Sequence, residues 1–103
     1  MTTRNLVGLR IRMESGTELT LRGREAWALE ELLRAGRQGV TPISRPAPRW
    51  SDYIKRLRAK GIVIATLSEP HDGPYHGRHG RYVLTSPLTV IETTYEVKAR
   101  VAH

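Results

Sequence analysis

Apolar and polar residues alternate in the first part of the chain. The apolar members of the alternation are Val7, Leu9, Ile11 and Met13, and the residues between them are Gly8, Arg10 and Arg12. A repeat of two places successive side chains on opposite faces of an extended chain, which is typical of a strand with one face buried. The pattern predicts a strand over residues 6–13.

A turn and a second short apolar run follow this strand. Residues 15–17 are the turn formers Ser-Gly-Thr, and Leu19 and Leu21 alternate with polar residues after them. We expect a hairpin whose three-residue loop sets Met13 opposite Leu19 and Ile11 opposite Leu21. This register keeps the apolar residues on one face, whereas a two-residue loop would not.

The apolar spacing changes to three and four residues between positions 22 and 35, which predicts a helix. Its stripe consists of Ala26, Leu29, Leu32 and Leu33, with Trp27 beside it. Thr41 and Pro42 then have the residue types of an N-cap and a first helical position. Because Pro46 and Pro48 follow so soon, we expect this second helix to be about one turn long.

A third helix is predicted over residues 46–60, with its prolines in the first turn, where the amides have no intrahelical partner. One side is an apolar stripe formed by Trp50, Tyr53, Ile54 and Leu57. The other side carries Ser51, Asp52, Lys55, Arg56 and Ala59. Gly61 is expected to end the helix.

The last part of the chain alternates between strand formers and turn formers. Residues 62–67 and 81–85 are β-branched and apolar and are predicted to be strands. Residues 68–80 between them are rich in Gly, His and Pro and are predicted to form a long loop. After a break at Pro87, residues 89–97 have high strand propensity. Helices and strands in this mixed order predict an α+β fold.

Length and composition narrow the class of protein. A chain of 103 residues has room for one core, so we expect a single domain over residues 1–103. It has no cysteine, which excludes disulfides, cysteine-ligated zinc and thiol catalysis. We find no signal-peptide core and no apolar run of roughly 18 residues. We therefore expect a soluble cytoplasmic protein with no membrane partner.

The positive charge is concentrated in one stretch. The net charge is +7, and residues 34–60 alone carry eight Lys or Arg against Asp52. Such an excess indicates an acidic partner. Binding to a membrane surface would need bulky apolar residues free for insertion, but Trp50, Ile54 and Leu57 are required for the core. Nucleic acid is the better interpretation.

Helix, short helix, helix, strand, long loop, strand is the order of a winged helix. Three stretches also resemble a known family: Gly39-Val40-Thr41-Pro42-Ile43, Arg45-Pro46-Ala47-Pro48-Arg49-Trp50-Ser51 with Arg56-Leu57-Arg58-Ala59-Lys60-Gly61-Ile62, and His79-Gly80-Arg81-Tyr82-Val83-Leu84. Over about residues 19–86 the chain resembles the small winged-helix domain proteins of phages and bacterial genomes. We therefore expect a winged helix-turn-helix with an N-terminal β-hairpin and a C-terminal strand or tail over residues 87–103.

In this fold the third helix would enter the major groove of DNA and the loop 68–80 would be the wing. The residues predicted to contact DNA are Arg45, Arg49, Ser51, Asp52, Lys55, Arg56 and Arg78. Lys55 and Arg56 would reach base edges or phosphates, and Arg45 and Arg49 would hold phosphates at the helix N-terminus. Asp52 would accept a hydrogen bond from cytosine, or orient Arg49 or Arg56. The alternative is a solvated face of a basic protein.

Residues outside the third helix give weaker evidence for a binding or catalytic site. The wing offers Arg78, with His76 or His79, to a phosphate or a minor groove, and the alternative is a solvated loop with no dedicated role. The spacing of its His71, Asp72, His76 and His79 matches no familiar zinc pattern, so no metal or cofactor is expected. Trp27 and Trp50 are expected in the core. No catalytic pair, nucleophile motif or phosphate loop is present, so we expect neither an enzyme nor a small-molecule substrate.

The sequence thus favours a DNA-binding protein, a small transcriptional regulator of the bacterial nucleoid or a phage-infected cell. A domain of this size reads few base pairs, so we expect a homodimer through the terminal strands 6–13 and 89–97, both expected to be unpaired. The alternative is a protein–protein interaction module that uses the winged-helix scaffold without DNA readout. The nearly absent second helix and the terminal strand edges support that alternative.

Overall fold

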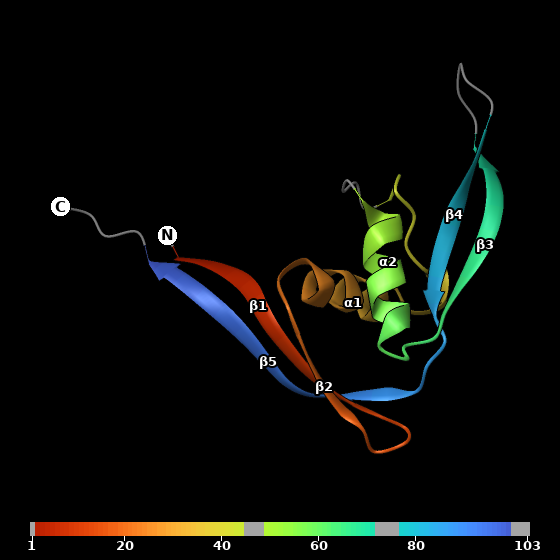
Figure 1. Cartoon of the computed structure of the whole chain (residues 1–103). Coiled ribbons are helices and arrows are strands. Elements are labelled where there is room, and N and C mark those ends of the chain that lie inside the picture. The colour runs from red at the N-terminus through yellow and green to blue at the C-terminus, as the bar shows by residue number, and fades with distance from the viewer. Residues whose placement is uncertain (1, 45–48, 72–76, 100–103) are drawn as a thin grey trace. The chain divides into compact units, whose positions relative to one another are not determined.

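The computed structural model describes residues 2–44, 49–71 and 77–99 (Figure 1). The chain divides into two compact units. The first unit combines Met1–Trp27 with Pro87–His103, and the second is Ala28–Ser86. Helix α1, Gly23–Ala35, begins in the first unit and ends in the second, and it confirms the helix predicted over residues 22–35.

The first unit contains an antiparallel sheet in the order β2-β1-β5. Its strands are β1 (Thr2–Met13), β2 (Glu18–Arg22) and β5 (Leu88–Ala99). The predicted strands 6–13 and 89–97 are therefore confirmed, and both are longer than expected. Among the side chains of this unit that the structure describes, Leu9, Ile11, Leu21 and Ala26 are buried. The sequence alternation thus places the buried face of β1 correctly.

The hairpin between β1 and β2 is confirmed, but its predicted register is wrong by two residues. Leu19 lies opposite Ile11 and not opposite Met13. The loop is residues 14–16, and it ends on Gly16, whose φ is 92°. The Gly16 N–H donates to the Met13 carbonyl at 2.9 Å. Because glycine adopts positive φ readily, the chain turns back one residue earlier than expected while the apolar face is kept.

The expectation that both terminal strands are unpaired is wrong. Strand β1 pairs with β2 along one edge and with β5 along the other. Its pairing with β5 runs from Thr2 opposite Ala99 to Met13 opposite Leu88, with irregularities near Gly8 and Arg10. The chain ends bond to each other because this pairing satisfies backbone groups that β1 would otherwise leave exposed.

The second unit contains the end of α1, the 3₁₀ helix η1 (Gly36–Gln38), helix α2 (Trp50–Ala59), and strands β3 (Ile64–His71) and β4 (Gly77–Leu84). Strands β3 and β4 form an antiparallel hairpin. Apolar side chains from α1, α2, the first residue of β3 and the segments just before α2 and β3 are buried: Ala28, Leu29, Leu32, Val40, Trp50, Tyr53, Ile54, Leu57, Ile62 and Ile64. The apolar stripe predicted for the third helix is part of this core and is confirmed.

The predicted second helix is not formed within residues 41–44, which make a turn. The turn has the hydrogen bonds of a helix N-terminus. The Thr41 hydroxyl accepts from the N–H groups of Ile43 and Ser44 at 3.2 and 2.9 Å, and the Ser44 hydroxyl accepts from the N–H of Thr41 at 3.0 Å. Thr41 thus makes the hydrogen bonds expected of an N-cap, but the described segment forms no helix after it.

Helix α2 begins at Trp50, and the prediction that it begins at Pro46 is wrong. Arg49 has a φ of 70° and a left-handed conformation, which a continuous right-handed helix does not contain. The positions of both prolines lie outside the described residues. At the other end, Gly61 donates to the Arg58 carbonyl at 3.0 Å and Ile62 to the Leu57 carbonyl at 3.3 Å. This is a Schellman motif, and it confirms Gly61 as the helix terminator.

The prediction of a loop over residues 68–80 is wrong in its extent. Strand β3 continues to His71 and strand β4 starts at Gly77, so much of this segment is paired. Pro70 is tolerated within β3 because that strand has β4 on one edge only, and the position needs no N–H on the other edge. The loop was predicted because Gly, His and Pro are frequent there, but much of the segment forms a two-stranded ribbon.

Gly39 allows the chain to pass close to β4. The next residue, Val40, exchanges two backbone hydrogen bonds of 2.8 Å with Tyr82. A Cβ atom at Gly39 would lie 2.6 Å from the Tyr82 carbonyl oxygen and 2.8 Å from a methyl carbon of Val83, and its φ is 69°. Both the space and the backbone conformation therefore require glycine.

This close approach leads to a prediction about two glycines. Gly61→Ala should lower the free energy of unfolding by about 1–2 kcal/mol, because only its positive φ is unfavourable and nothing lies near the new Cβ. Gly39→Ala should cost roughly 1–3 kcal/mol more, because Tyr82 must also move. Urea unfolding followed by tryptophan fluorescence measures both. Equal losses for the two variants would contradict the close approach.

Candidate nucleic-acid interface

Helix α2 is held to the second unit by aromatic packing at its first turn. The Trp50 side chain is buried, and its ring stacks on that of Tyr82 with a centroid separation of 6.3 Å and an interplanar angle of 26°. Tyr53 meets the Trp50 ring edge-on at 6.2 Å. Because these contacts fix the buried side of the helix, they also fix which side chains face solvent. Trp50 is confirmed as a core residue, whereas Trp27 is half-buried beneath the Arg24 guanidinium.

The solvent-facing side of α2 carries most of the predicted contact residues. Ser51 and Lys55 are exposed and lie one helical turn apart on the same face. Arg49 is exposed immediately before the helix. Within the part of the chain that the structure describes, these three side chains make no hydrogen bond or ion pair. They are available to an external partner, whereas predicted contact residue Arg45 lies outside the described residues.

Asp52 is paired with Arg56 on the exposed side of the helix. The Arg56 Nε atom lies 3.2 Å from the Asp52 Oδ2 atom, and both side chains are substantially exposed. Of the two partners that the sequence offered to Asp52, the structure brings Arg56 to it. The two residues lie one helical turn apart. The ion pair therefore limits the positions that the Arg56 guanidinium can reach, but the guanidinium stays exposed to solvent.

Arg58 has a different role from its neighbours. Its Nη2 atom donates to the Ile64 carbonyl at 2.6 Å and to the Thr66 hydroxyl at 2.7 Å, and its Nε atom also donates to Ile64. The side chain therefore joins the end of α2 to strand β3. Arg58 is part of the basic stretch over residues 34–60, but its guanidinium N–H groups donate to other residues of the protein.

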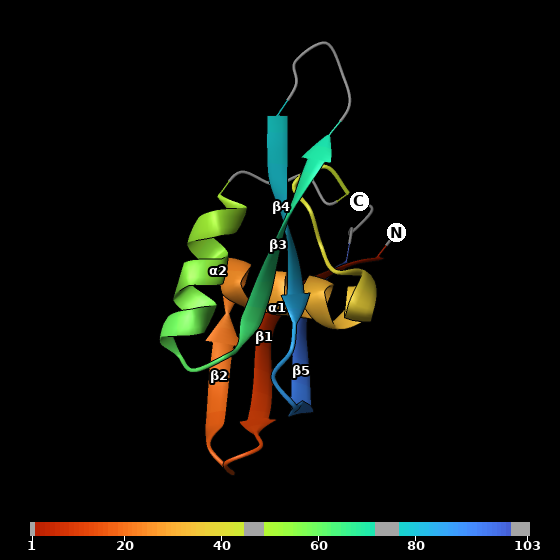
Figure 2. The same ribbon diagram turned by 90° about the vertical axis from the view of Figure 1, so that its right-hand side faces the viewer.

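Arg78 lies on the β3–β4 hairpin and is exposed. Its guanidinium donates to the Ser68 hydroxyl at 2.8 Å and to the Ser68 carbonyl at 3.0 Å. The hairpin and α2 belong to the same unit, and the N-terminal end of α2 lies at the same end of that unit as the outer end of the hairpin (Figures 1 and 2). A single surface of a binding partner can therefore contact both the start of α2 and the hairpin.

The comparisons with known proteins agree with this arrangement. A family model described as a winged helix domain matches residues 18–94. The chain belongs to this winged helix family. Neither a curated protein nor a solved structure matches the chain. The predicted winged-helix fold class and the resemblance to a small winged-helix family are confirmed. The β3–β4 hairpin is called the wing below.

The wing is stiffened by a cluster that the sequence did not reveal. Glu69 accepts from the Nη2 and Nε atoms of Arg81 at 2.7 and 2.9 Å, and its Oε1 atom lies 2.8 Å from the Nε2 atom of His79. Arg81 also donates to the Gln38 carbonyl at 2.7 Å. His79, which the sequence offered to a phosphate, is thus engaged within the wing. The cluster follows from Glu69 lying opposite His79, a register that residue types alone do not specify.

The same cluster changes the acidity of Glu69. Hydrogen bonds from Arg81 first, and then from His79, lower the pKa of Glu69 from 4.5 to about 2. The bond with Glu69 also raises the pKa of Arg81. The carboxylate is therefore ionised at all physiological pH values, and the wing keeps its cross-strand pair.

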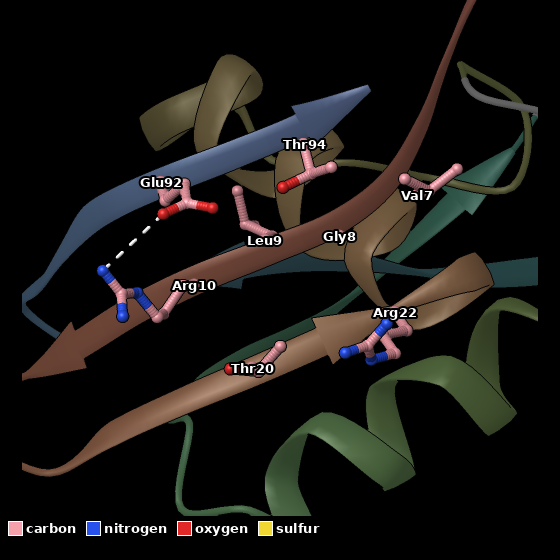
Figure 3. A pocket seen from close by; sticks show the side chains of 8 residues that line it. All are labelled: Val7, Gly8, Leu9, Arg10, Thr20, Arg22, Glu92 and Thr94. Carbon is pink, nitrogen blue, oxygen red and sulfur yellow. Dashed lines mark ion pairs between the residues drawn. The ribbon is translucent and has the colours of Figure 1, made fainter. Parts of the chain in front are cut away.

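The first unit has a hollow on its sheet. It has a volume of about 190 Å³ and is lined by Val7, Gly8, Leu9, Arg10, Thr20, Arg22, Glu92 and Thr94 (Figure 3). Gly8 leaves space there because it has no side chain, and Arg10 pairs with Glu92 at 3.7 Å. None of the predicted contact residues lines this hollow.

The described residues contain no group of three or more His, Asp or Glu side chains placed to hold a metal ion. No helix among them is long and apolar enough to cross a membrane.

The lowered pKa of Glu69 leads to a prediction about acid stability. Above about pH 4.5 the ionised Glu69 contributes stability, and this contribution is lost as the pH falls towards about 2. Wild type should therefore be more stable than Glu69→Gln at pH 6, and the difference should shrink as the pH falls to 2. Urea midpoints across this range measure it. Glu14→Gln, at an exposed loop position, should show no such converging difference, and a Glu69→Gln difference independent of pH would contradict the assignment.

Proposed function

We propose that this winged helix protein binds double-stranded DNA, with the exposed face of α2 in the major groove and the wing on the adjacent backbone. One observation carries the proposal: the buried aromatic side of α2 turns Ser51, Lys55 and Arg56 towards solvent on one surface. A groove of DNA accepts a helix presented in this way, and cationic side chains neutralise its phosphates.

Each residue of the interface has a proposed role. Lys55 and Arg56 contact base edges or phosphates, and the Asp52 carboxylate orients the Arg56 guanidinium. Ser51 supplies a polar contact. The exposed Arg49 approaches the phosphates at the start of the helix. Guanidinium groups suit this task because they bind phosphate and guanine through paired hydrogen bonds.

Two residues outside the helix complete the interface. Arg78 contacts the backbone from the wing, where its bonds to Ser68 hold the side chain along the ribbon. Arg45 holds a phosphate ahead of the helix, a role that rests on its charge and its place in the sequence.

The proposed biological role is that of a small transcriptional regulator acting as a homodimer, in a bacterial nucleoid or a phage-infected cell. Winged helix domains are typically non-enzymatic DNA-binding modules, and we propose no catalysis. We propose a dimer because one recognition helix contacts few base pairs. Two copies would read two half-sites and so bind a longer sequence specifically.

A protein–protein interaction module remains the second candidate function. The observation that favours it is the turn at residues 42–44, where a second helix was expected. In a helix-turn-helix the element before the recognition helix crosses the DNA backbone, and a single turn provides little of that contact.

The proposal predicts that Lys55→Ala with Arg56→Ala weakens DNA binding without unfolding the protein. Both side chains are exposed, so urea stability should stay nearly unchanged. Loss of a base-reading contact costs about 1–3 kcal/mol of binding free energy, and each lost phosphate contact lowers the log–log salt slope by about 0.9. Mobility shifts with duplex DNA at several salt concentrations measure both effects.

The matched control removes two positive charges elsewhere. Arg34→Ala with Arg37→Ala changes the net charge equally, at exposed positions outside α2. This control should retain more affinity than the α2 variant. If the wild type shows no retention on heparin and no shift of random duplex at about 0.1 M salt, DNA binding is excluded and the interaction module is favoured.

A further inference from the structure

The hollow of the first unit lies on the exposed face of the β2-β1-β5 sheet. Leu9 and Leu21 are buried, so the residues that alternate with them, among them Gly8 and Arg22, are on the opposite face. Gly8 pairs with Arg22 on one side and with Thr94 on the other (Figure 3). Because neighbouring strands lie about 4.8 Å apart, the two flanking backbones are roughly 10 Å apart, with no side chain between them.

The fold itself does not require glycine at position 8. The φ of Gly8 lies outside the positive range that favours glycine, unlike that of Gly39. A Cβ atom at Gly8 would have its nearest neighbours at 3.7 Å, which is ordinary contact, whereas a Cβ at Gly80 would lie 3.1 Å from the Thr66 methyl group. Glycine inside a strand weakens it and often marks a place where a ligand approaches the backbone closely. Gly8 fits that description.

A β-bulge beside Gly8 adds a second side chain to the hollow. In the pairing with β5, Leu6 lies opposite Tyr95 and Gly8 lies opposite Thr94, so Val7 is the extra residue. A bulge re-aims a side chain out of the regular alternation, and Val7 and its neighbour Gly8 both line the hollow. The type of bulge that needs glycine has it in the left-handed conformation, which Gly8 does not adopt. The bulge thus supplies an apolar side chain, but it does not account for the glycine.

The charges around the hollow leave one cation without a partner. The lining has two arginines against one glutamate. The Arg10 Nη2 atom lies 3.7 Å from the Glu92 Oε2 atom, so these two charges offset each other. Arg22 is exposed, and within the part of the chain that the structure describes its side chain makes no hydrogen bond or ion pair. Among the same residues, the hydroxyls of Thr20 and Thr94 also make no hydrogen bond. The hollow therefore offers one positive charge and unused hydroxyl donors.

We propose that this hollow binds a small carboxylate that carries a short apolar chain. The carboxylate lies above Gly8, between the Arg22 guanidinium and the Thr94 hydroxyl, and the apolar chain contacts Val7. A guanidinium matches a carboxylate because its two parallel N–H groups donate to the two oxygens. Glu92 at the rim disfavours a ligand with two negative charges, such as a phosphate monoester.

The size of the hollow limits the length of the ligand. Its volume is about 190 Å³. Since one water molecule takes about 30 Å³ in the liquid, this space corresponds to roughly six waters. A carboxylate with about two to four carbon atoms has a comparable size. The inference goes beyond the proposed function, because the site needs neither DNA nor any residue of the candidate interface.

Titration of ¹⁵N-labelled protein with sodium propionate at pH 7 tests the site. Chloride keeps the ionic strength constant at about 0.15 M, so that screening does not change. Propionate is raised to about 50 mM, because a ligand of so few atoms binds weakly. The amide signals of Gly8, Arg22 and Thr94 should shift along saturable curves with one shared dissociation constant. Methyl phosphate, which carries nearly two negative charges at pH 7, should bind more weakly.

Two variants remove the proposed contacts. Arg22→Gln should raise the propionate dissociation constant about tenfold or more, because a charged hydrogen-bond donor is lost. Gly8→Val should abolish saturable binding, because its side chain fills the hollow. The matched control is Arg12→Gln, an exposed arginine of the same strand that pairs with Glu18 and does not line the hollow. Its affinity should stay within about twofold of wild type, since salt screens the lost charge.

A third variant should improve binding. Glu92→Gln removes the negative charge at the rim and releases the Arg10 guanidinium. It should therefore lower the propionate dissociation constant and bring methyl phosphate close to propionate in affinity. A gain of this kind cannot result from damage to the fold.

Several outcomes would overturn the inference. These are a wild type with no saturable shifts, an equal loss of affinity in Arg12→Gln and Arg22→Gln, and weaker propionate binding by Glu92→Gln. If Gly8→Val proves unfolded by circular dichroism, Gly8→Ala replaces it, because its Cβ has only ordinary contacts. Unchanged affinity in a folded Gly8→Ala would then place the ligand elsewhere. None of these measurements contains DNA, so their failure is distinct from failure of DNA binding.

Discussion

The second unit is organised around Tyr82. Its backbone exchanges two hydrogen bonds with Val40, and its ring stacks on Trp50. One residue thus joins three segments: the chain leaving α1, the start of α2 and the wing strand β4. The backbone bonds require glycine at position 39, and the stack requires α2 to present Trp50 inward. The exposed face of α2 is a consequence of these constraints.

The positively charged side chains fall into two groups that composition cannot separate. Arg58 and Arg81 use their donors on carbonyl and carboxylate groups of the fold. Lys55 and Arg49 have no such partner among the described residues and remain exposed. Arg58 joins α2 to β3 with these donors, so the candidate interface is smaller than the basic stretch over residues 34–60 that suggested it.

The two hairpins deal with their edges differently. In the wing, Arg58 occupies the open edge of β3 and the Glu69 cluster holds β3 to β4. In the first unit, β1 is paired on both edges, with β2 on one side and β5 on the other. Side-chain pairs across the two strands stabilise the wing in one register.

Sequence by itself determined the features that depend on local spacing. The alternation over residues 6–13, the stripe of α2 and the stop at Gly61 each reflect side chains a few positions apart, and all three are confirmed. The order of these elements was enough to predict the winged helix. The candidate DNA-contact face of α2 followed from the same periodicity.

Tertiary structure decided the features that depend on distant partners. The pairing of β1 with β5 joins residues at opposite ends of the chain, and Glu69 meets Arg81 only once the strands are in register. The helix start depends on the left-handed Arg49, a conformation that residue type does not favour. Local propensity is similar for many pairings and turn conformations, so the choice among them is made by long-range hydrogen bonds and packing.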